Sequence, residues 1–364
     1  MVVKYRPFEG FSLFGIHSSK YNISRMADGN RYYEQFSPDF ENIVTSVAGQ
    51  TGSYDFGVDI KEKPITLECF CNGITEFERR WVEGWLAPGK VGKLVYDESP
   101  FKYYMVKLAS PTNFSFIPYS YGISGEGILY KGTFTLELVA LYPYALSRFN
   151  TLDELIYDNP SGALYYNSGL LYSEIIPPAI FENITNNFNA ILYNGGNANA
   201  KANVKITGTW NELTIINRST DQEFTLGKND VISTFEVDAN LGQCRHSNLG
   251  VLATDYHDGT YLHVEGTGWV DMYEGISFIS GSDIVSFPAN TALDEGLEGK
   301  FIFMEDGQYE IKEIIGENQI RLMDNFVGTS GDYNITIAKA NKIAILGSNL
   351  NISRLEFAYK YTYY

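Results

Sequence analysis

The densest group of residues that could do chemistry lies between positions 244 and 263. It holds three of the four histidines and one of the three cysteines: Cys244, His246, His257 and His263. Thiolate and imidazole groups are ligands that zinc prefers. Known structural sites pair their ligands at set spacings, whereas here one residue separates the first pair and five separate the second. On adjacent strands these side chains could converge, but packed polar residues are commoner, so we expect no metal site and keep the four as candidates.

Aromatic side chains in the same region suggest a second kind of chemistry. Tyr256, Trp269 and Tyr273 could stack on sugar rings, which makes them candidates for binding a glycan. Packing within a core or an interface is the alternative role for each of them. Glycan binding therefore stays open as an alternative function.

Signatures of enzymes are otherwise missing from the sequence. It has no G-x-x-x-x-G-K-[ST] phosphate loop, no H-E-x-x-H, no G-x-S-x-G and no C-x-x-C. The glycines at 122, 125 and 127 lack the preceding buried strand and following helix that a nucleotide loop needs. His257 and Asp258 are adjacent, so on a strand they point to opposite faces. We expect no enzyme activity and no cofactor.

Carboxylates are abundant enough to form pairs by chance. Asp153 with Glu154, or Asp294 with Glu295, could be taken for the acid and base of a glycosidase. Because 44 of the 364 residues are acidic, we interpret these groups as a solvated acidic surface. The 27 Lys and Arg residues leave a formal net charge of −17. Such a chain repels phosphate backbones, so we expect no direct binding of nucleic acid.

The chain carries no sign of a membrane or secretory segment. It has no apolar stretch of about 18 residues and no amino-terminal signal peptide, which predicts a soluble protein without membrane insertion. Cys69, Cys71 and Cys244 are an odd number of cysteines in a long chain, which indicates reduced thiols.

The elements that must position these residues are mostly strands, because 27 Tyr and 23 Phe suit half-buried pleated surfaces. Alternation over residues 65–71 predicts a strand with one buried face. Thr75 and Glu78 then fit a capping box that starts a helix. Aromatic and apolar residues recur at helical spacing along it, and we expect their common face to pack on a sheet: Phe77, Trp81, Trp85 and Leu86.

The rest of the chain divides into three further parts. Residues 151–178 have little periodicity and contain adjacent prolines, which indicates a linker. From about residue 180, short alternating runs separated by turns predict a β-sandwich. Within it, residues 266–341 contain an Asp306-Gly307 hairpin signal and predict a small barrel of about five strands.

The order of features in the first 150 residues resembles the amino-terminal domain of phage distal tail proteins, the Dit family. An aromatic segment FEGFSLFG is followed by a glycine-punctuated turn, VTSVAGQTGSYDFG, and by the strand ITLECFC. The helix ERRWVEGWL then leads into GKLVYDESPFKYYMVKL, with its paired tyrosines. This last stretch is the most characteristic part of the resemblance.

The resemblance implies a mainly β fold with two domains. Residues 1–150 would be a β-sandwich-type, ring-forming domain with one helix. Residues 179–265 and 342–364 would be a galectin-like β-sandwich, split by the insertion at 266–341. Enlarged members of the family can carry carbohydrate-binding modules at such insertions, although about 75 residues is short for one.

The resemblance also implies a structural role in the virion. Distal tail proteins form a hexameric ring that joins the tail tube to the tail-tip or tail-associated protein and, in many phages, to receptor-binding proteins. We therefore expect this chain at the virion tail tip, with assembly in the host cytoplasm. An adhesion module that binds a host cell-wall glycan through the carboxy-terminal sandwich or its insert is the alternative.

Overall fold

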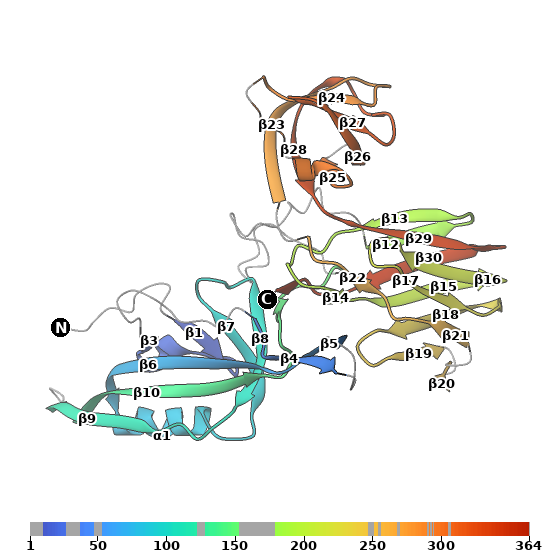
Figure 1. The fold of residues 1–364 in the computed structure, drawn as a ribbon. Helices are drawn as coiled ribbons and strands as arrows, with labels where there is room; N and C mark the ends of the chain where they lie inside the picture. The colour runs from blue at the N-terminus through green and yellow to red at the C-terminus, as the bar shows by residue number, and fades with distance from the viewer. Residues whose placement is uncertain are drawn as a thin grey trace. The chain divides into compact units, whose positions relative to one another are not determined.

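The structure is a computed structural model, and it describes residues 10–26, 37–46, 53–121, 128–152, 179–246, 251–253, 256–267, 270–289, 291, 293, 295–304 and 307–363. Within these residues the chain is mainly β with one α-helix, as the sequence predicts (Figure 1). The chain divides into two units, the first formed by Met1–Arg148 with Tyr363–Tyr364 and the second by Phe149–Thr362. The described residues include no helix with the length and apolar character needed to cross a membrane.

The first unit is built on a ten-stranded sheet whose main path runs β2-β1-β7-β8-β10-β6-β3, with β9 beside β10 and β11 beside β8. Its elements are β1 (Phe11–Leu13), β2 (Ile16–His17), the 3-10 helix η1 (Ser18–Tyr21), β3 (Ile23–Arg25), β6 (Lys63–Thr75), α1 (Glu76–Trp85), β7 (Val91–Tyr96), β8 (Lys102–Leu108), β9 (Phe114–Tyr121), β10 (Ile128–Ala140), β11 (Ala145–Ser147) and β31 (Thr362–Tyr363). A separate two-stranded sheet pairs β4 (Phe40–Thr45) with β5 (Tyr54–Ile60).

Strands β6 and β10 form the long antiparallel centre of this sheet, and β6 alternates between buried and outward-facing residues. The buried positions are those that the period of two predicts: Ile65, Leu67, Cys69 and Cys71. Each strand therefore has one face toward the core and one face toward solvent.

Helix α1 begins directly after β6 with the predicted capping box. The amide of Glu78 donates to Thr75 Oγ1 at 3.2 Å, and the amide of Thr75 donates to Glu78 Oε2 at 2.8 Å. At its other end Trp85 is buried, and its Nε1 donates to the carbonyl of Leu13 at 2.7 Å. The helix is thus fixed at both ends to the strands that it covers.

The sequence predicts that the aromatic residues of α1 share one face that packs on a sheet. This prediction is wrong for Phe77 and Trp81. Val82, Trp85 and Leu86 are buried, but Phe77 is 69% exposed and Trp81 is 57% exposed. Successive positions four residues apart drift around a helix by about 40°, because four residues exceed the 3.6 of one turn. The run that starts at Phe77 therefore begins on the outer face and reaches the core only at Trp85.

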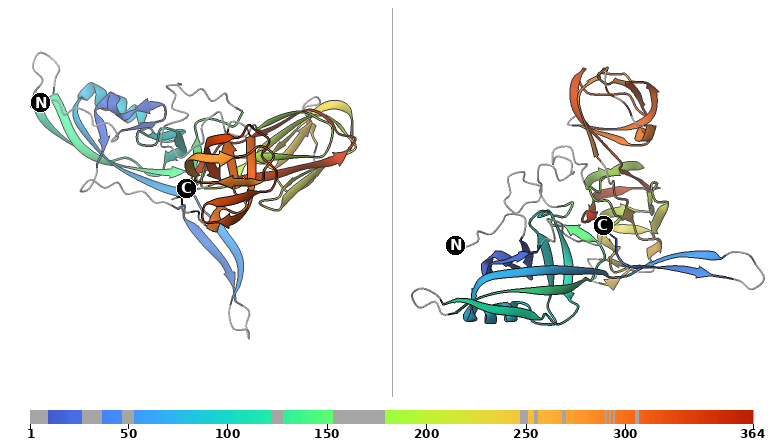
Figure 2. Two further views of the ribbon diagram at one scale, coloured as in Figure 1. Left: turned by 90° about the horizontal axis from the view of Figure 1, so that it is seen from above. Right: turned by 60° about the vertical axis from the view of Figure 1, so that its left-hand side comes forward.

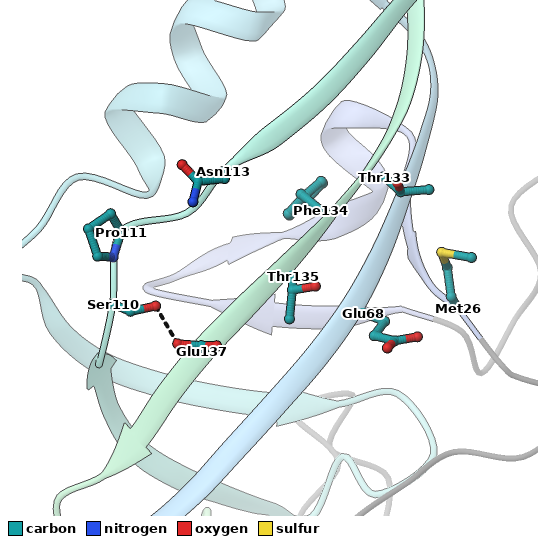
Figure 3. A pocket seen from close by; sticks show the side chains of 9 residues that line it. All are labelled: Met26, Glu68, Ser110, Pro111, Asn113, Thr133, Phe134, Thr135 and Glu137. Carbon is teal, nitrogen blue, oxygen red and sulfur yellow. Dashed lines mark hydrogen bonds between the residues drawn. The ribbon is translucent and has the colours of Figure 1, made fainter.

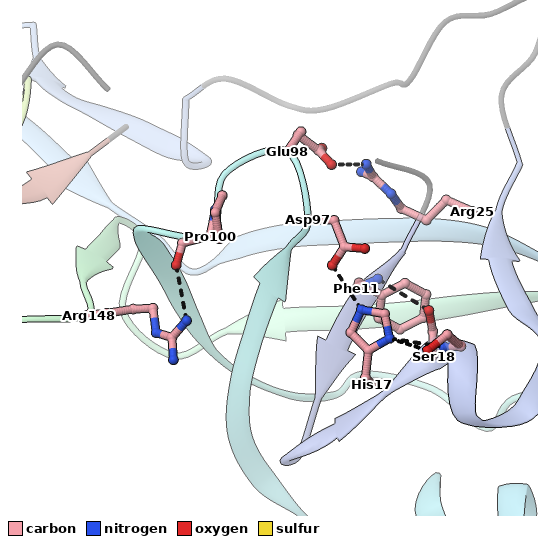
Figure 4. Close-up of polar contacts among 9 residues, drawn as sticks. Phe11, His17, Ser18, Arg25, Asp97, Glu98, Pro100 and Arg148 are labelled. Atoms are coloured by element: carbon pink, nitrogen blue, oxygen red, sulfur yellow. Dashed lines mark hydrogen bonds and ion pairs between the residues drawn. The ribbon is translucent and has the colours of Figure 1, made fainter. Parts of the chain in front are cut away.

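Polar contacts join the start of the first unit to the turn between β7 and β8 (Figure 4). His17 Nε2 lies 3.0 Å from Asp97 Oδ1, and Arg25 pairs with Glu98. On the other side of this turn, Arg148 Nη1 donates to the carbonyl of Pro100 at 3.4 Å. These contacts hold together segments that lie far apart in the sequence.

The second unit contains two larger sheets arranged as a sandwich. The six-stranded sheet consists of β12 (Ile180–Ile184), β30 (Asn351–Ala358), β15 (Asn203–Trp210), β18 (Asn229–Asp238), β19 (Gln243–His246) and β20 (Val251–Leu252). The five-stranded sheet consists of β13 (Phe188–Leu192), β29 (Asn341–Ser348), β16 (Glu212–Asn217), β17 (Gln222–Leu226) and β21 (His257–Gly259), and β14 (Ala200–Lys201) pairs with β22 (His263–Val264).

A closed barrel lies within the chain of the second unit. Its six strands, in barrel order, are β23 (Val270–Phe278), β24 (Ile284–Ser286), β27 (Gln319–Leu322), β26 (Gly307–Gly316), β25 (Phe301–Met304) and β28 (Gly331–Ala338), with the 3-10 helix η3 (Glu295–Leu297) before β25. The sequence pattern predicts a barrel of about five strands, and β23 is the strand that this prediction does not contain. A bulge between Tyr273 and Ile276, where Gly275 has a φ of +67°, interrupts the alternation of β23 and hides it from the pattern.

The two ends of the barrel segment meet at a single buried side chain. Asn341 Oδ1 accepts from the amide of Glu265 at 2.8 Å, and Asn341 Nδ2 donates to the carbonyl of Glu265 at 2.9 Å. A segment whose ends lie side by side can be inserted without disturbing the strands around it. The predicted domain bounds stay predictions, and residues 153–178 of the predicted linker lie outside the described residues.

Candidate assembly surface

The most unusual surface of the first unit is the hairpin of β4 and β5, which we call the arm. It comprises residues Phe40–Thr45 and Tyr54–Ile60, and every one of them is exposed. Its two strands pair only with each other (Figure 2). An isolated two-stranded hairpin is at best marginally stable in water, so such an element is usually completed by another surface.

The arm is amphipathic. In β5 the alternate residues Tyr54, Phe56, Val58 and Ile60 share one face, and Phe40 of β4 joins them because it lies opposite Ile60. Phe56 is 65% exposed and Phe40 is 58% exposed. The opposite face carries the carboxylates Glu41, Asp55 and Asp59, with Lys61 placed between two of them, and it also carries Val44, which lies opposite Asp55. The arm thus presents an apolar stripe backed by an acidic face.

A second apolar surface is the outer face of α1. The rings of Phe77 and Trp81 contact each other edge to face, with centroids 6.0 Å apart. Arg80 and Gly84 complete this face at the spacing of one and two turns, and space around Gly84 is open. We call Phe77, Arg80, Trp81 and Gly84 the helix face. Exposed aromatic pairs of this kind mark protein interaction sites.

A polar hollow of about 700 Å³ lies on the outward side of β6 and β10 (Figure 3). Its walls include the carboxylates Glu68 and Glu137, and Ser110 donates a hydrogen bond to Glu137. The lining residues that the structure describes include no His, Cys, Lys or Arg. The hollow is therefore an acidic, hydroxyl-bearing part of the sheet surface.

The candidate metal ligands are distributed over three separate sheets. Cys244 and His246 lie on β19, His257 on β21 and His263 on β22. Within the described part of the chain, no group of three or more His, Cys, Asp or Glu side chains is placed to hold a metal ion. The hypothesis of a site shared by these four residues therefore has no support from their positions.

Packing explains what these side chains do instead. The ring of His246 contacts Phe235 with centroids 4.7 Å apart, and His257 stacks on Tyr261 at 4.9 Å. Burial lowers the pKa values of His257 and His263, and it raises the pKa of the Cys244 thiol to about 11. Burial thus favours the neutral forms of His257, His263 and Cys244.

The candidate glycan-binding aromatic residues lie in different surroundings. Tyr256 is 47% exposed and its ring contacts Phe235, whereas Tyr273 packs against the core of the barrel beside Phe287. Trp269 lies outside the described residues. A glycan site remains a prediction.

Most of the carboxylates considered as a glycosidase pair, and the glycines considered as a nucleotide loop, are not among the residues that the structure describes. These residues are Asp153, Glu154, Asp294 and the glycines at 122, 125 and 127. The three cysteines are free and buried.

The arm is the surface element that the sequence analysis does not predict. The segment 44–57 was expected to be a glycine-punctuated turn, but Tyr54–Ile60 forms a strand of its own. Alternation of Tyr54, Phe56, Val58 and Ile60 with small or acidic residues is the signal that could have found it.

Comparison with known proteins gives the class of the first unit. Residues 16–140 match the model of the family described as the phage tail protein RIFT-related domain. These residues therefore form a domain of that family, and the predicted resemblance to phage distal tail proteins is confirmed. The match spans the arm and the helix face, so both surfaces lie in a region that matches a phage tail protein domain.

Two solved structures resemble the chain over most of its length. The Dit protein of phage SPP1, described as a paradigm of the hub adsorption apparatus in phages that infect Gram-positive bacteria, is 9% identical with a TM-score of 0.44, over 91% of this chain and 98% of that one. A chain of the phage P2 baseplate in its activated conformation is 11% identical with a TM-score of 0.28. The match covers 94% of this chain and 99% of the baseplate chain. A search of curated proteins found no match.

Proposed function

We propose that this chain is the distal tail hub of a phage. Six copies form a ring through the domain of residues 1–150, and the ring joins the tail tube to the tail-tip protein and the receptor-binding apparatus. The observation that carries the proposal is the match of residues 16–140 to a phage tail family, in the same unit that exposes the arm and the helix face. The carboxy-terminal sandwich, residues 179–265 and 342–364, faces outward partners.

Physical arguments support an assembling role. The arm and the helix face belong to one unit, and an oligomer removes such apolar surfaces from water. A ring made by head-to-tail contacts uses two different surfaces on each copy, which this unit provides. The net charge of −17 fits a channel for DNA, because an acidic wall does not retain phosphates.

Labelling of intact virions tests the proposed location. Antibodies raised against the chain and conjugated to gold are applied to phage particles that carry it, and the particles are imaged. We expect gold at the tail end farthest from the capsid. Gold along the tube, at the capsid or at no fixed place would overturn the proposal. Labelling with antibodies against the tube protein serves as the matched control.

A further inference from the structure

We propose that the apolar face of the arm in one copy packs on the helix face of α1 in the next copy of this chain. This inference deepens the proposed ring by naming the two surfaces that meet. Its elements are the stripe of Phe40, Tyr54, Phe56, Val58 and Ile60 on one side, and Phe77, Arg80, Trp81 and Gly84 on the other.

The first step is that the arm exposes its apolar residues in the part of the first unit that the structure describes. All thirteen of its residues are exposed, although seven of them are aliphatic or aromatic. Among the described strands, β4 and β5 pair only with each other, and a two-stranded ribbon needs a further strand or a packed face to be stable. The arm is therefore shaped for a surface supplied from outside.

The second step is that a single copy cannot bring its own arm onto its own helix face. The arm precedes β6 and α1 follows it, so the 13 residues of β6 separate them. A strand of this length spans about 43 Å at about 3.3 Å per residue. In Figure 2 the arm points away from the end of β6 where α1 begins. Two complementary surfaces at opposite ends of one unit make a head-to-tail contact, the kind that closes a ring.

The third step is that the two surfaces match in chemistry. Aromatic rings pair favourably with the aromatic and β-branched residues of a strand, and Phe77 and Trp81 offer such rings. Arg80 lies beside them on the helix, with its Nε 3.8 Å from a carboxylate oxygen of Glu76. Gly84 has no side chain and lets the backbone of the arm approach.

Disulfide trapping tests the contact directly. The chain's own cysteines are buried, so engineered ones react first. The double variant Phe56→Cys/Trp81→Cys is oxidised and run on a denaturing gel without reductant. We expect a ladder of covalent oligomers up to the hexamer, on the order of tenfold above the single variants, because a disulfide forms only when the Cα atoms approach within about 7 Å.

The controls decide between this contact and others. In Phe56→Cys/Val231→Cys the second cysteine replaces an exposed residue of β18 in the other unit, and we expect no ladder. Phe56→Cys alone should stay monomeric on the gel; strong dimers from it would mean that two arms pair with each other and would overturn the proposal. Removal of the apolar stripe is a second measurement: Phe56→Ser/Val58→Ser should weaken assembly, because it takes two apolar side chains out of the contact.

The same samples separate this inference from the proposed function. Light scattering under native conditions reports whether a ring exists at all. A ring without a ladder in the double variant overturns the contact of arm and helix face but leaves the hub. A chain that stays monomeric in every sample overturns both.

Discussion

Two histidines of the second unit are held neutral by their surroundings. Burial lowers the pKa of His257, and burial together with the nearby Lys201 lowers the pKa of His263. The Nε2 atom of His257 is buried without a hydrogen-bond partner among the described residues. Protonating either ring in the folded chain is therefore unfavourable, whereas the unfolded chain takes up protons near the ordinary value of about 6.5.

This difference predicts a pH dependence of stability. Since the unfolded chain binds more protons in this range, the free energy of unfolding of the second unit falls as the pH drops below about 6.5. Pulse proteolysis in urea, with fragments of the two units resolved by mass, measures it. In His257→Gln/His263→Gln we expect the loss between about pH 8 and about pH 5.5 to shrink by at least roughly half. An unchanged loss would mean that other groups cause it.

For the three cysteines we predict that their thiols do not react with a labelling reagent in the folded chain. Burial raises the pKa values of Cys71 and Cys244 to about 11, and it raises that of Cys69 as well. At pH 8 the thiolate fraction of a group with such a pKa is on the order of a thousandth. A chromogenic disulfide reagent should therefore label no thiol in the native chain and all three after denaturation. Rapid labelling of native protein would show that a thiol is accessible.

At the scale of elements, prediction from sequence succeeded where a signal is local. The capping box of Thr75 and Glu78 and the alternation of β6 follow from near neighbours in the chain, and both are present in the structure. Prediction failed where the outcome depends on distant partners. The exposure of Phe77 and Trp81, and the isolation of the arm, follow from which surfaces lie beside them, and no local pattern contains that information.

The capping box makes a stability prediction for the first unit. Thr75→Ala removes the acceptor for the amide of Glu78, and we expect the free energy of unfolding to fall by about 1 kcal/mol. Thr75→Ser keeps a hydroxyl at the same place and should lose much less. Pulse proteolysis of the first unit measures both variants. Equal losses in the two would show that the methyl group, and not the hydrogen bond, stabilises this end of α1.

For the whole molecule, the proposed function assigns assembly to the first unit and outward contacts to the second unit. Residues 16–140 match the model of a phage tail protein domain, and the arm and the helix face both lie within that span. The second unit adds a sandwich and a closed barrel to it. Contacts between copies arise from the match of two surfaces, so a single sequence can indicate the surfaces but not the number of copies.

The central claim is that this chain forms a ring, and its mass in solution tests that claim most directly. Light scattering on the purified chain is measured over a series of concentrations, alone and with the tail tube protein, and the main peak is imaged. The account predicts a particle of six times 40.9 kDa with a central opening. A mass that stays at 40.9 kDa at every concentration, with and without the tube protein, would contradict it.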